Sequence, residues 1–292
     1  MNNVASVKDR LKNLSVSTGK TMQEMFVAYA LERTIYRLSI SPYLDNFVLK
    51  GGIFLYAVFS GNYTRATTDI DLLAIRTSND EESIRRIFAE VFSIEADDPL
   101  RYDLESLRVT AITEFKDYHG VNVSVMSYLE RSRIPVSIDI GFGDVIYPGR
   151  VEMDFPVVLS ETSPRVYAYS LSSCVAEKFE AIVSLGYDNS RFKDFYDIYS
   201  LAISYDFDGA ELSKSLQETF EHRHTSMEEI VAFEPGFTEE PLRQSRWNGF
   251  VKKKKAMTPV TLEETVKLIK TFLTPVMEGT KLHWSHERIE WV

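Results

Sequence analysis

The sequence has almost no cysteine and no long apolar run. Cys174 is the single cysteine among 292 residues, so the chain cannot form an intramolecular disulfide or supply several thiolates to one metal. The longest apolar stretches, near residues 25–31 and 54–59, are far shorter than the roughly 20 residues that a membrane-spanning helix needs. Residues 1–15 carry charges where a signal peptide needs an apolar segment. These absences predict a protein of the reducing cytoplasm with no membrane contact.

The sequence also lacks an excess of positive charge. Its 33 lysines and arginines are outnumbered by 43 aspartates and glutamates, for a formal net charge of −10. A chain of this charge does not attract nucleic-acid phosphates over its whole surface, so any contact with RNA needs a local basic face. A histone-like or nonspecific duplex-binding protein is therefore excluded. The hydrophobic share of 44% is enough for a sizeable core in one large domain or two smaller ones.

Apolar periodicity predicts an α+β protein in two parts. The first part is expected to contain two helices before Pro42, a strand at 47–49, a helix at 53–59, a strand at 69–75, a helix from 79–82 to 92, and strands at 107–112, 121–125 and 136–142. Short connections between the last strands favour a mixed or antiparallel sheet. After residue 170 the pattern is almost wholly helical. Capping boxes at Thr21–Glu24 and Thr261–Glu264 predict where the second and the last helix begin. We therefore predict an α/β domain at 1–165 with N-terminal helices, followed by a helical domain at 166–292.

Three carboxylates fall on predicted strands. Asp69 and Asp71 are two residues apart, so in a strand their side chains share a face and repel each other unless a proton or a cation lies between them. An isolated Asp-x-Asp most often marks only an exposed edge or a turn. The third carboxylate, Asp139, has isoleucine on both sides, where an unpaired charge is costly. Three such groups on neighbouring strands predict a two-metal site for Mg²⁺ or Mn²⁺.

A glycine turn precedes the acidic pair. Lys50, Gly51 and Gly52 link the strand at 47–49 to the helix at 53–59. Without side chains, such a turn lets a phosphate reach backbone N–H groups at a helix N-terminus. A Gly-Gly pair is most often only a turn, but together with the acidic cluster it predicts both halves of a nucleoside triphosphate site.

These residues carry a family resemblance. The string Lys50-Gly-Gly, Arg65 and Thr68-Asp-Ile-Asp-Leu72 resembles the AbiEii/AbiGii toxin branch of the DNA polymerase β-like nucleotidyltransferases. The resemblance continues through residues 138–144, 176–178 and 191–198, and so covers about 45–200. It implies a polymerase β-like mixed-sheet core followed by a C-terminal helical bundle that completes the nucleotide site.

The resemblance also implies roles for single residues. Asp69 and Asp71 would bind the metals, Asp139 would help to activate the attacking hydroxyl, and Gly51 and Gly52 would hold the triphosphate. Lys178 matches the lysine that faces the nucleotide phosphates, and either Asp194 or Asp197 matches the acid that follows it. The spacing from Gly52 to Asp69 is longer than in the superfamily at large, and the added stretch holds two further nucleotide-binding candidates, Arg65 and Thr68. A solvated polar loop is the alternative for that stretch.

The implied activity is transfer of a nucleoside monophosphate from a nucleoside triphosphate to a hydroxyl, with release of pyrophosphate. In relatives the acceptor is the 3′ end of tRNA, and the enzyme is the toxin of a toxin–antitoxin or abortive-infection system with a cognate antitoxin. Direct contact between toxin and antitoxin is left open. An antibiotic-type small-molecule nucleotidyltransferase, a non-catalytic nucleotide-binding regulator and a metal-dependent phosphohydrolase are the rivals. The phosphohydrolase is disfavoured because no histidine lies near the three aspartates in sequence.

Two segments are candidates for RNA contact. Arg243, Arg246 and Trp247 precede the run Lys252–Lys255, a mixture of basic and aromatic residues that could follow an RNA backbone and stack one base. A solvated helix end is the equal alternative. Arg131, Arg133 and Arg150 near the third acidic strand are further candidates. The two histidine pairs, at 222 and 224 and at 283 and 286, lack the partners of a zinc site and are expected at the surface.

Overall fold

The computed structural model describes residues 3–62, 67–113, 119–159, 162–253 and 259–292. The chain divides into two compact units. The first, the sheet unit, holds Met1–Gly143 and Val151–Ala168. The second, the helical unit, holds Asp144–Arg150 and Tyr169–Val292.

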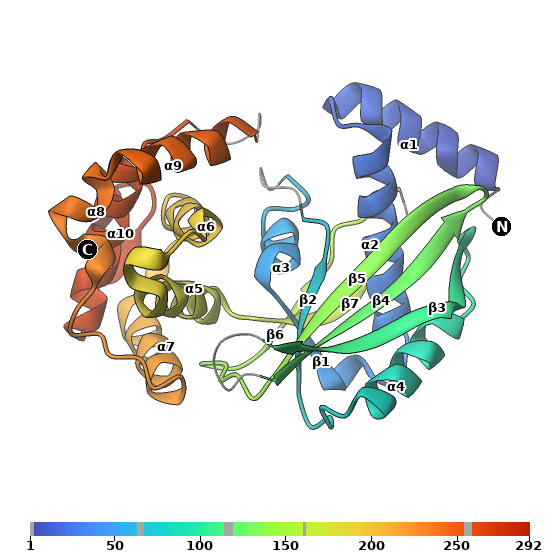
Figure 1. The fold of residues 1–292 in the computed structure, drawn as a ribbon, viewed down its shortest axis with the longest axis horizontal. Coiled ribbons are helices and arrows are strands. Elements are labelled where there is room, and N and C mark those ends of the chain that lie inside the picture. Colours follow the sequence, from blue (N-terminus) through green and yellow to red (C-terminus); the bar gives the residue numbers. More distant parts are fainter. Residues whose placement is uncertain (1–2, 63–66, 114–118, 160–161, 254–258) are drawn as a thin grey trace. The chain divides into compact units, whose positions relative to one another are not determined.

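The sheet unit contains four helices and seven strands among its described residues (Figure 1). The helices are α1 (Val4–Thr18), α2 (Met22–Ser39), α3 (Gly51–Val58) and α4 (Glu81–Ser93), with a 3₁₀ turn at Leu44–Asn46. The strands are β1 (Phe47–Lys50), β2 (Ile70–Ala74), β3 (Leu100–Thr113), β4 (His119–Leu129), β5 (Ser132–Phe142), β6 (Val151–Asp154) and β7 (Arg165–Ala168).

These strands form one mixed sheet in the order β3-β4-β5-β2-β1-β7-β6. The pairs β2–β5 and β1–β7 are parallel, and the other neighbours are antiparallel. Helix α2 packs on β5 and α4 packs on β3. The predicted α+β fold with a mixed-sheet core is therefore confirmed.

Local sequence explains where the helices begin. In the predicted capping box at α2, the Thr21 hydroxyl accepts from the N–H of Glu24 and the Glu24 carboxylate accepts from the N–H of Thr21. The same arrangement opens α10, between Thr261 and Glu264. Asp80 caps α4 by accepting from two backbone N–H groups. These contacts lie within four residues of chain, which is why the sequence alone predicts them.

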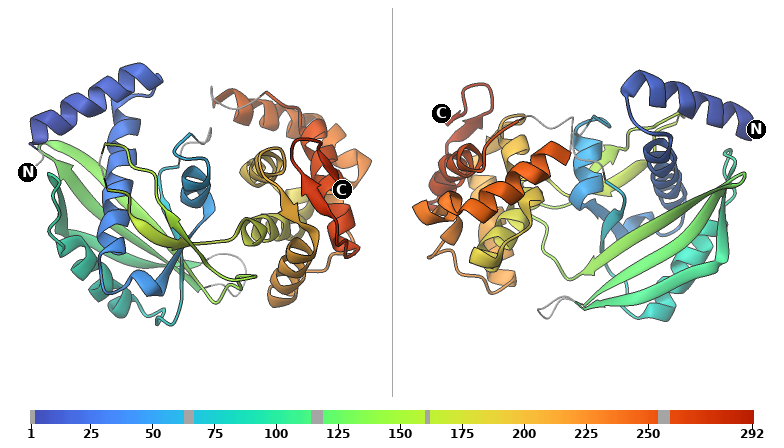
Figure 2. Two further views of the ribbon diagram at one scale, coloured as in Figure 1. Left: turned by 180° about the vertical axis from the view of Figure 1, so that it is seen from behind. Right: turned by 45° about the horizontal axis from the view of Figure 1, so that its top comes forward.

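The helical unit is built from six helices in its described residues, as the predicted C-terminal bundle requires (Figure 2). They are α5 (Leu171–Leu185), α6 (Phe192–Ala202), α7 (Gly209–His222), α8 (Pro235–Glu239), α9 (Pro241–Lys253) and α10 (Leu262–Met277), with 3₁₀ turns at Gly186–Asp188 and Val231–Phe233. No helix in the described part of the chain is long and apolar enough to cross a membrane.

The sequence missed several strands. Strands β6 and β7 have four residues each, which is too short for alternation to stand out. A small antiparallel sheet of β8 (Phe207–Asp208), β9 (His283–Ser285) and β10 (Glu290–Trp291) lies in the region predicted as helical. Strand β3 starts at Leu100 rather than at 107, because a register shift between Asp103 and Arg108 interrupts the apolar alternation.

Candidate active site

Strand register brings the predicted site residues of the sheet unit into one row. Lys50 lies opposite Asp71 in the antiparallel pair β1–β2, and Asp71 lies opposite Asp139 in the parallel pair β2–β5. Residues directly opposite in neighbouring strands share a face of the sheet. Both aspartates are half-buried. Asp139 is far from Asp71 in sequence, and only the pairing of β2 with β5 makes them neighbours.

The glycine turn lies in close contact with the Asp71 carboxylate. The backbone N–H of Gly52, at the start of α3, donates to the Asp71 Oδ2 atom at 3.0 Å. Gly51 has φ +61°, a left-handed conformation, and a Cβ at that position would lie 2.2 Å from the same oxygen. Lys50 provides no side-chain cap to α3. The turn is therefore glycine both because of its backbone angle and because a carboxylate occupies the space of a side chain.

Replacing Gly51 by alanine is expected to damage both stability and activity. An alanine at this φ costs about 1–2 kcal/mol, and its Cβ would push the Asp71 carboxylate from its place. We expect the free energy of unfolding to fall by at least that amount, and the nucleotide transfer that the family resemblance implies to fall by about tenfold or more. Chemical denaturation and single-turnover assays measure the two effects.

Gly19→Ala is the matched control. Gly19 also has a positive φ, +70°, but no atom lies within 4 Å of an added Cβ. The control should therefore show the conformational cost without the loss of activity. Equal activity losses in both variants would contradict a specific fit between Gly51 and Asp71.

Asp69 and Thr68 lie just before β2. The Thr68 hydroxyl donates to the Asp69 Oδ2 atom at 3.0 Å, and the Thr67 hydroxyl donates to the Asp69 carbonyl at 3.1 Å. Asp69 is half-buried and Thr68 is exposed. The other candidate of this stretch, Arg65, lies outside the described residues.

Asn122 is a site residue that sequence reasoning missed. It lies opposite Asp139 in the pair β4–β5, and its side-chain amide donates to the Asp139 Oδ1 atom at 2.6 Å and to the Ser137 hydroxyl at 2.9 Å. Its only signal in the sequence is a polar residue between Val121 and Val123 in a predicted strand. That alternation assigns Asn122 to the polar face, but it does not identify the residue opposite. Asn122 thus holds one carboxylate oxygen of Asp139.

The three carboxylates do not converge on one point. Among the described residues, no three histidine, cysteine, aspartate or glutamate side chains gather closely enough to hold a metal ion. Asp71 is bound to the Gly52 N–H, Asp139 to Asn122, and Asp69 to Thr68. Each carboxylate therefore has its own local donor, which reduces the repulsion among three like charges.

The helical unit contains a buried cluster of the remaining predicted residues, Lys178, Asp194 and Asp197. The Lys178 Nζ atom, from α5, donates to Asp197 Oδ2 at 2.6 Å and to Asp194 Oδ1 at 3.2 Å, both from α6. The Arg191 Nε atom donates to the other oxygen of Asp194 at 2.8 Å. The Lys178 side chain is 9% exposed. Both aspartates are thus partners of Lys178, and the cluster joins two helices.

The chain is similar to known proteins over most of its length. The family model for the nucleotidyl transferase AbiEii toxin of type IV toxin–antitoxin systems matches residues 33–268, most of the chain. The chain belongs to the AbiEii family. It is therefore a nucleotidyltransferase of a toxin family, and a type IV toxin–antitoxin system implies a cognate antitoxin. The predicted family is confirmed.

Two solved structures from Helicobacter pylori resemble this AbiEii-family chain in fold. One is JHP933, with a TM-score of 0.50 and 14% identity over 88% of this chain and 93% of its own. The other is described as a candidate nucleotidyltransferase, with a TM-score of 0.51 and 15% identity over 92% of this chain and 99% of its own. No curated protein matches the sequence.

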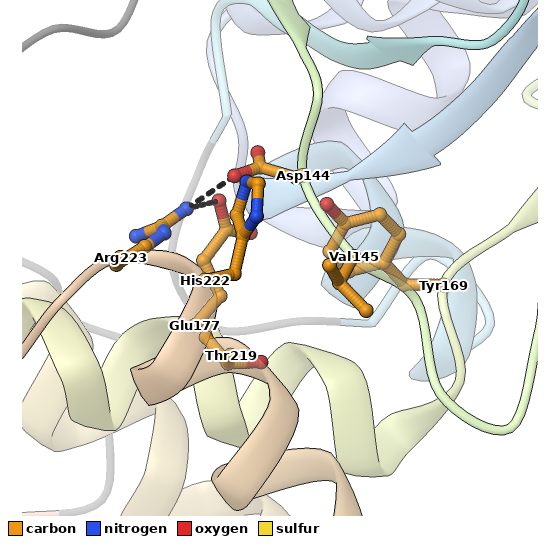
Figure 3. Close-up of a pocket in the computed structure, with 7 residues that line it drawn as sticks. All are labelled: Asp144, Val145, Tyr169, Glu177, Thr219, His222 and Arg223. Carbon is orange, nitrogen blue, oxygen red and sulfur yellow. Dashed lines mark hydrogen bonds and ion pairs between the residues drawn. The ribbon is translucent and has the colours of Figure 1, made fainter.

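The AbiEii-family helical unit has a second charged cluster, centred on Arg223 (Figure 3). Its guanidinium donates to Asp144 at 2.9 Å, to Glu177 at 2.7 Å and to Glu180 at 2.8 Å. Burial alone would lower the pKa of Arg223, but Glu177 and Asp144 raise it above its usual value. His222, a predicted surface histidine, is exposed beside them. The cluster fixes the segment that follows β5 onto α5 and α7.

The structure assigns part of the predicted RNA-contacting strip to the core. Trp247 is 1% exposed and its indole N–H donates to the carbonyl of Val260, so it cannot stack a base. Arg243 is 9% exposed and donates to the carbonyls of Phe237 and Tyr187. Arg246 and Lys252 are exposed, whereas Lys254 and Lys255 lie outside the described residues. The mixture of basic and aromatic residues at 243–247 is therefore mainly a packing feature of α9.

Cys174 provides a test of how tightly α5 is packed in this AbiEii-family protein. It is 2% exposed, and burial raises the pKa of its thiol from 9.0 to about 12. The thiolate is the reactive form, so at pH 8 we expect iodoacetamide to label the native protein about 10³-fold more slowly than the unfolded protein. Mass spectrometry against time measures this ratio. Equal rates in buffer and in denaturant would contradict the packing of α5.

Proposed function

We propose that the chain is a Mg²⁺- or Mn²⁺-dependent enzyme that transfers a nucleoside monophosphate from a nucleoside triphosphate to a hydroxyl at the 3′ end of RNA, with tRNA as the acceptor. The observation that carries this proposal is the row of Lys50, Asp71 and Asp139 beside the Gly51-Gly52 turn. The family membership supports the reaction class, and the choice of donor, metal and acceptor is our inference.

The donor set suits a hard divalent cation. Asp69, Asp71 and Asp139 offer only carboxylate oxygens, which Mg²⁺ and Mn²⁺ prefer over nitrogen or sulfur. The carboxylates would have to turn from their present donors toward a common point to hold the ion. When bound, such an ion supplies positive charge to the reacting phosphate.

The residues of the protein would bind the substrates and accept the proton of the acceptor hydroxyl. The oxygen of the acceptor hydroxyl forms a bond to the α-phosphorus, the bond from that phosphorus to the bridging oxygen breaks, and pyrophosphate leaves with the electron pair. Asn122 binds one oxygen of Asp139 and leaves the other available to take the hydroxyl proton. The α3 N-terminus, where Asp71 accepts from the Gly52 N–H, adds partial positive charge that suits the negative triphosphate. Lys178 would reach a phosphate only by releasing Asp194 or Asp197.

The rival with a specific chemical basis is a small-molecule nucleotidyltransferase. Its acceptor cleft should be lined with carboxylates, whereas an RNA acceptor needs cations near the site.

The proposed substrates are cytoplasmic, and we propose the same compartment for the enzyme.

The direct test supplies each radiolabelled nucleoside triphosphate with Mg²⁺ and total tRNA. We expect label from at least one α-labelled triphosphate to enter tRNA, and about 10³-fold less to enter with Asp71→Asn. Label from the γ-phosphate should stay in pyrophosphate. Equal labelling by wild type and variant, or labelling of a small molecule but never of RNA, would overturn the proposal.

A further inference from the structure

Strands β3, β4 and β5 have one apolar face and one open, polar face. In β5, Ile134, Val136, Ile138 and Ile140 are buried, while the alternate residues Arg133, Pro135, Ser137 and Asp139 are exposed or half-buried. Helices α2 and α4 pack on these strands, which run side by side in both views of Figure 2. The buried residues belong to the packed face, so the face that carries Asp139 is the open one. We call this the open face.

The open face carries an aromatic ring between two cations. Tyr128 of β4 lies opposite Arg101 of β3 on one side and opposite Arg133 of β5 on the other. Both arginines are exposed and Tyr128 is half-buried. Among the described residues, no carboxylate lies within ion-pair distance of either arginine, and no other ring contacts Tyr128. An aromatic ring flanked by two guanidinium groups is suited to stack a base and to bind the phosphates on either side.

The open face extends along the strands from the row that contains Tyr128 to Asp139. Asp139 lies six residues along β5 from Arg133, which is about 20 Å at 3.3 Å per residue. The rows between them hold Ser124 opposite Ser137 and Met126 opposite Pro135. These side chains are neutral and leave a continuous surface along the strands.

The charged side chains along the path to Asp139 are mostly cationic. Arg108 adds a third exposed cation opposite Ser124, and its guanidinium donates only to the backbone carbonyls of Glu105 and Leu107 in the described residues. Asp103, opposite Met126, is the acidic exception on this path. In a chain of net charge −10, a cationic area that ends at Asp139 is a local attraction for a polyanion.

We propose that the open face binds the single-stranded 3′ segment of the acceptor RNA. Its terminal hydroxyl would lie at Asp139, a base upstream would stack on Tyr128, and phosphates would contact Arg101 and Arg133. At about 3.4 Å per stacked nucleotide, the 20 Å path holds roughly six nucleotides. The inference rests on the proposed function, because it assumes an RNA acceptor, and it names the surface that selects that acceptor.

The experiment compares kinetic constants of exposed-residue variants of the full chain. Arg101→Ala/Arg133→Ala should raise the KM for tRNA about tenfold, with the KM for the nucleoside triphosphate unchanged. Tyr128→Ala should raise the tRNA KM about fivefold or more, and Tyr128→Phe should restore it because the ring is kept. Losing two phosphate contacts should also lower the slope of log affinity against log salt by about 1.4.

Arg86→Ala is the matched control, since Arg86 is an exposed arginine on α4. It should leave the tRNA KM unchanged. Crosslinking of wild type to RNA that carries 4-thiouridine near its 3′ end should label peptides of β3, β4 or β5, and it needs no variant to fold.

The outcomes separate this inference from the proposed function. If wild type labels no RNA, the proposed function fails, and the assignment of the open face fails with it. If wild type labels tRNA but the variants keep its KM, or crosslinks map only to α9, the open face is not the RNA path and the proposed function stands. Loss of antitoxin binding in the variants, with the tRNA KM unchanged, would assign the face to a protein partner and overturn the inference.

Discussion

Asp71→Asn is expected to lower nucleotide transfer by about 10³-fold while leaving the fold intact. Asparagine keeps an oxygen that can accept from the Gly52 N–H, so the contact that joins β2 to α3 survives. It removes the negative charge, and with it a proposed ligand of the divalent cation, and a bound cation would lower the free energy of the transition state by several kcal/mol. Single-turnover transfer from a labelled nucleoside triphosphate at saturating Mg²⁺ measures the loss.

The control for Asp71→Asn is Asp9→Asn, which removes one exposed carboxylate from α1. It should keep full activity and an unchanged thermal midpoint. If Asp71→Asn lost activity only because it unfolded, its thermal midpoint would fall by many degrees. If it retained more than about a tenth of wild-type activity, Asp71 would not be a ligand of a required metal.

Lys178→Met is expected to lower the free energy of unfolding by about 3–5 kcal/mol, because it removes the cation of a buried ion pair. Asp197 is fully buried and binds the Lys178 ammonium at 2.6 Å. Methionine fills most of the volume but leaves that charge without its ammonium partner. Denaturant unfolding of the full chain, followed by tryptophan fluorescence, measures the difference.

A second variant separates a structural role of Lys178 from a role in phosphate binding. Lys178→Met/Asp197→Asn removes both charges and should recover much of the lost stability, since neutral replacement of a whole buried pair is far less costly than removal of one partner. If Lys178 also binds the triphosphate, the double variant will be stable but will keep a raised KM for the nucleotide. Recovery of both stability and KM would limit Lys178 to joining α5 and α6.

Features that depend on a few neighbouring residues were accessible from sequence. The capping boxes at Thr21 and Thr261 were predicted correctly, as was the strand, glycine turn and helix around Gly51. The longer β3 and the short strands β6 to β10 were not, because their apolar patterns are short or interrupted. The proposed roles of the acidic residues stay predictions.

The sequence by itself determined which chemical groups the site contains: a glycine turn, an Asp-x-Asp pair, and a third aspartate between isoleucines. Residue spacing along one strand was sufficient for that, since alternation assigns side chains to faces. Tertiary structure alone decided which groups meet, because β2 pairs with β5 and β5 with β4 in one register. That register places Asp71 beside Asp139, and Asp139 beside Asn122. A shift by a single residue would move every side chain of a strand to the opposite face, which the buried face excludes. The choice of β5 as the partner of β2 joins segments far apart in the chain, and no local pattern specifies that choice.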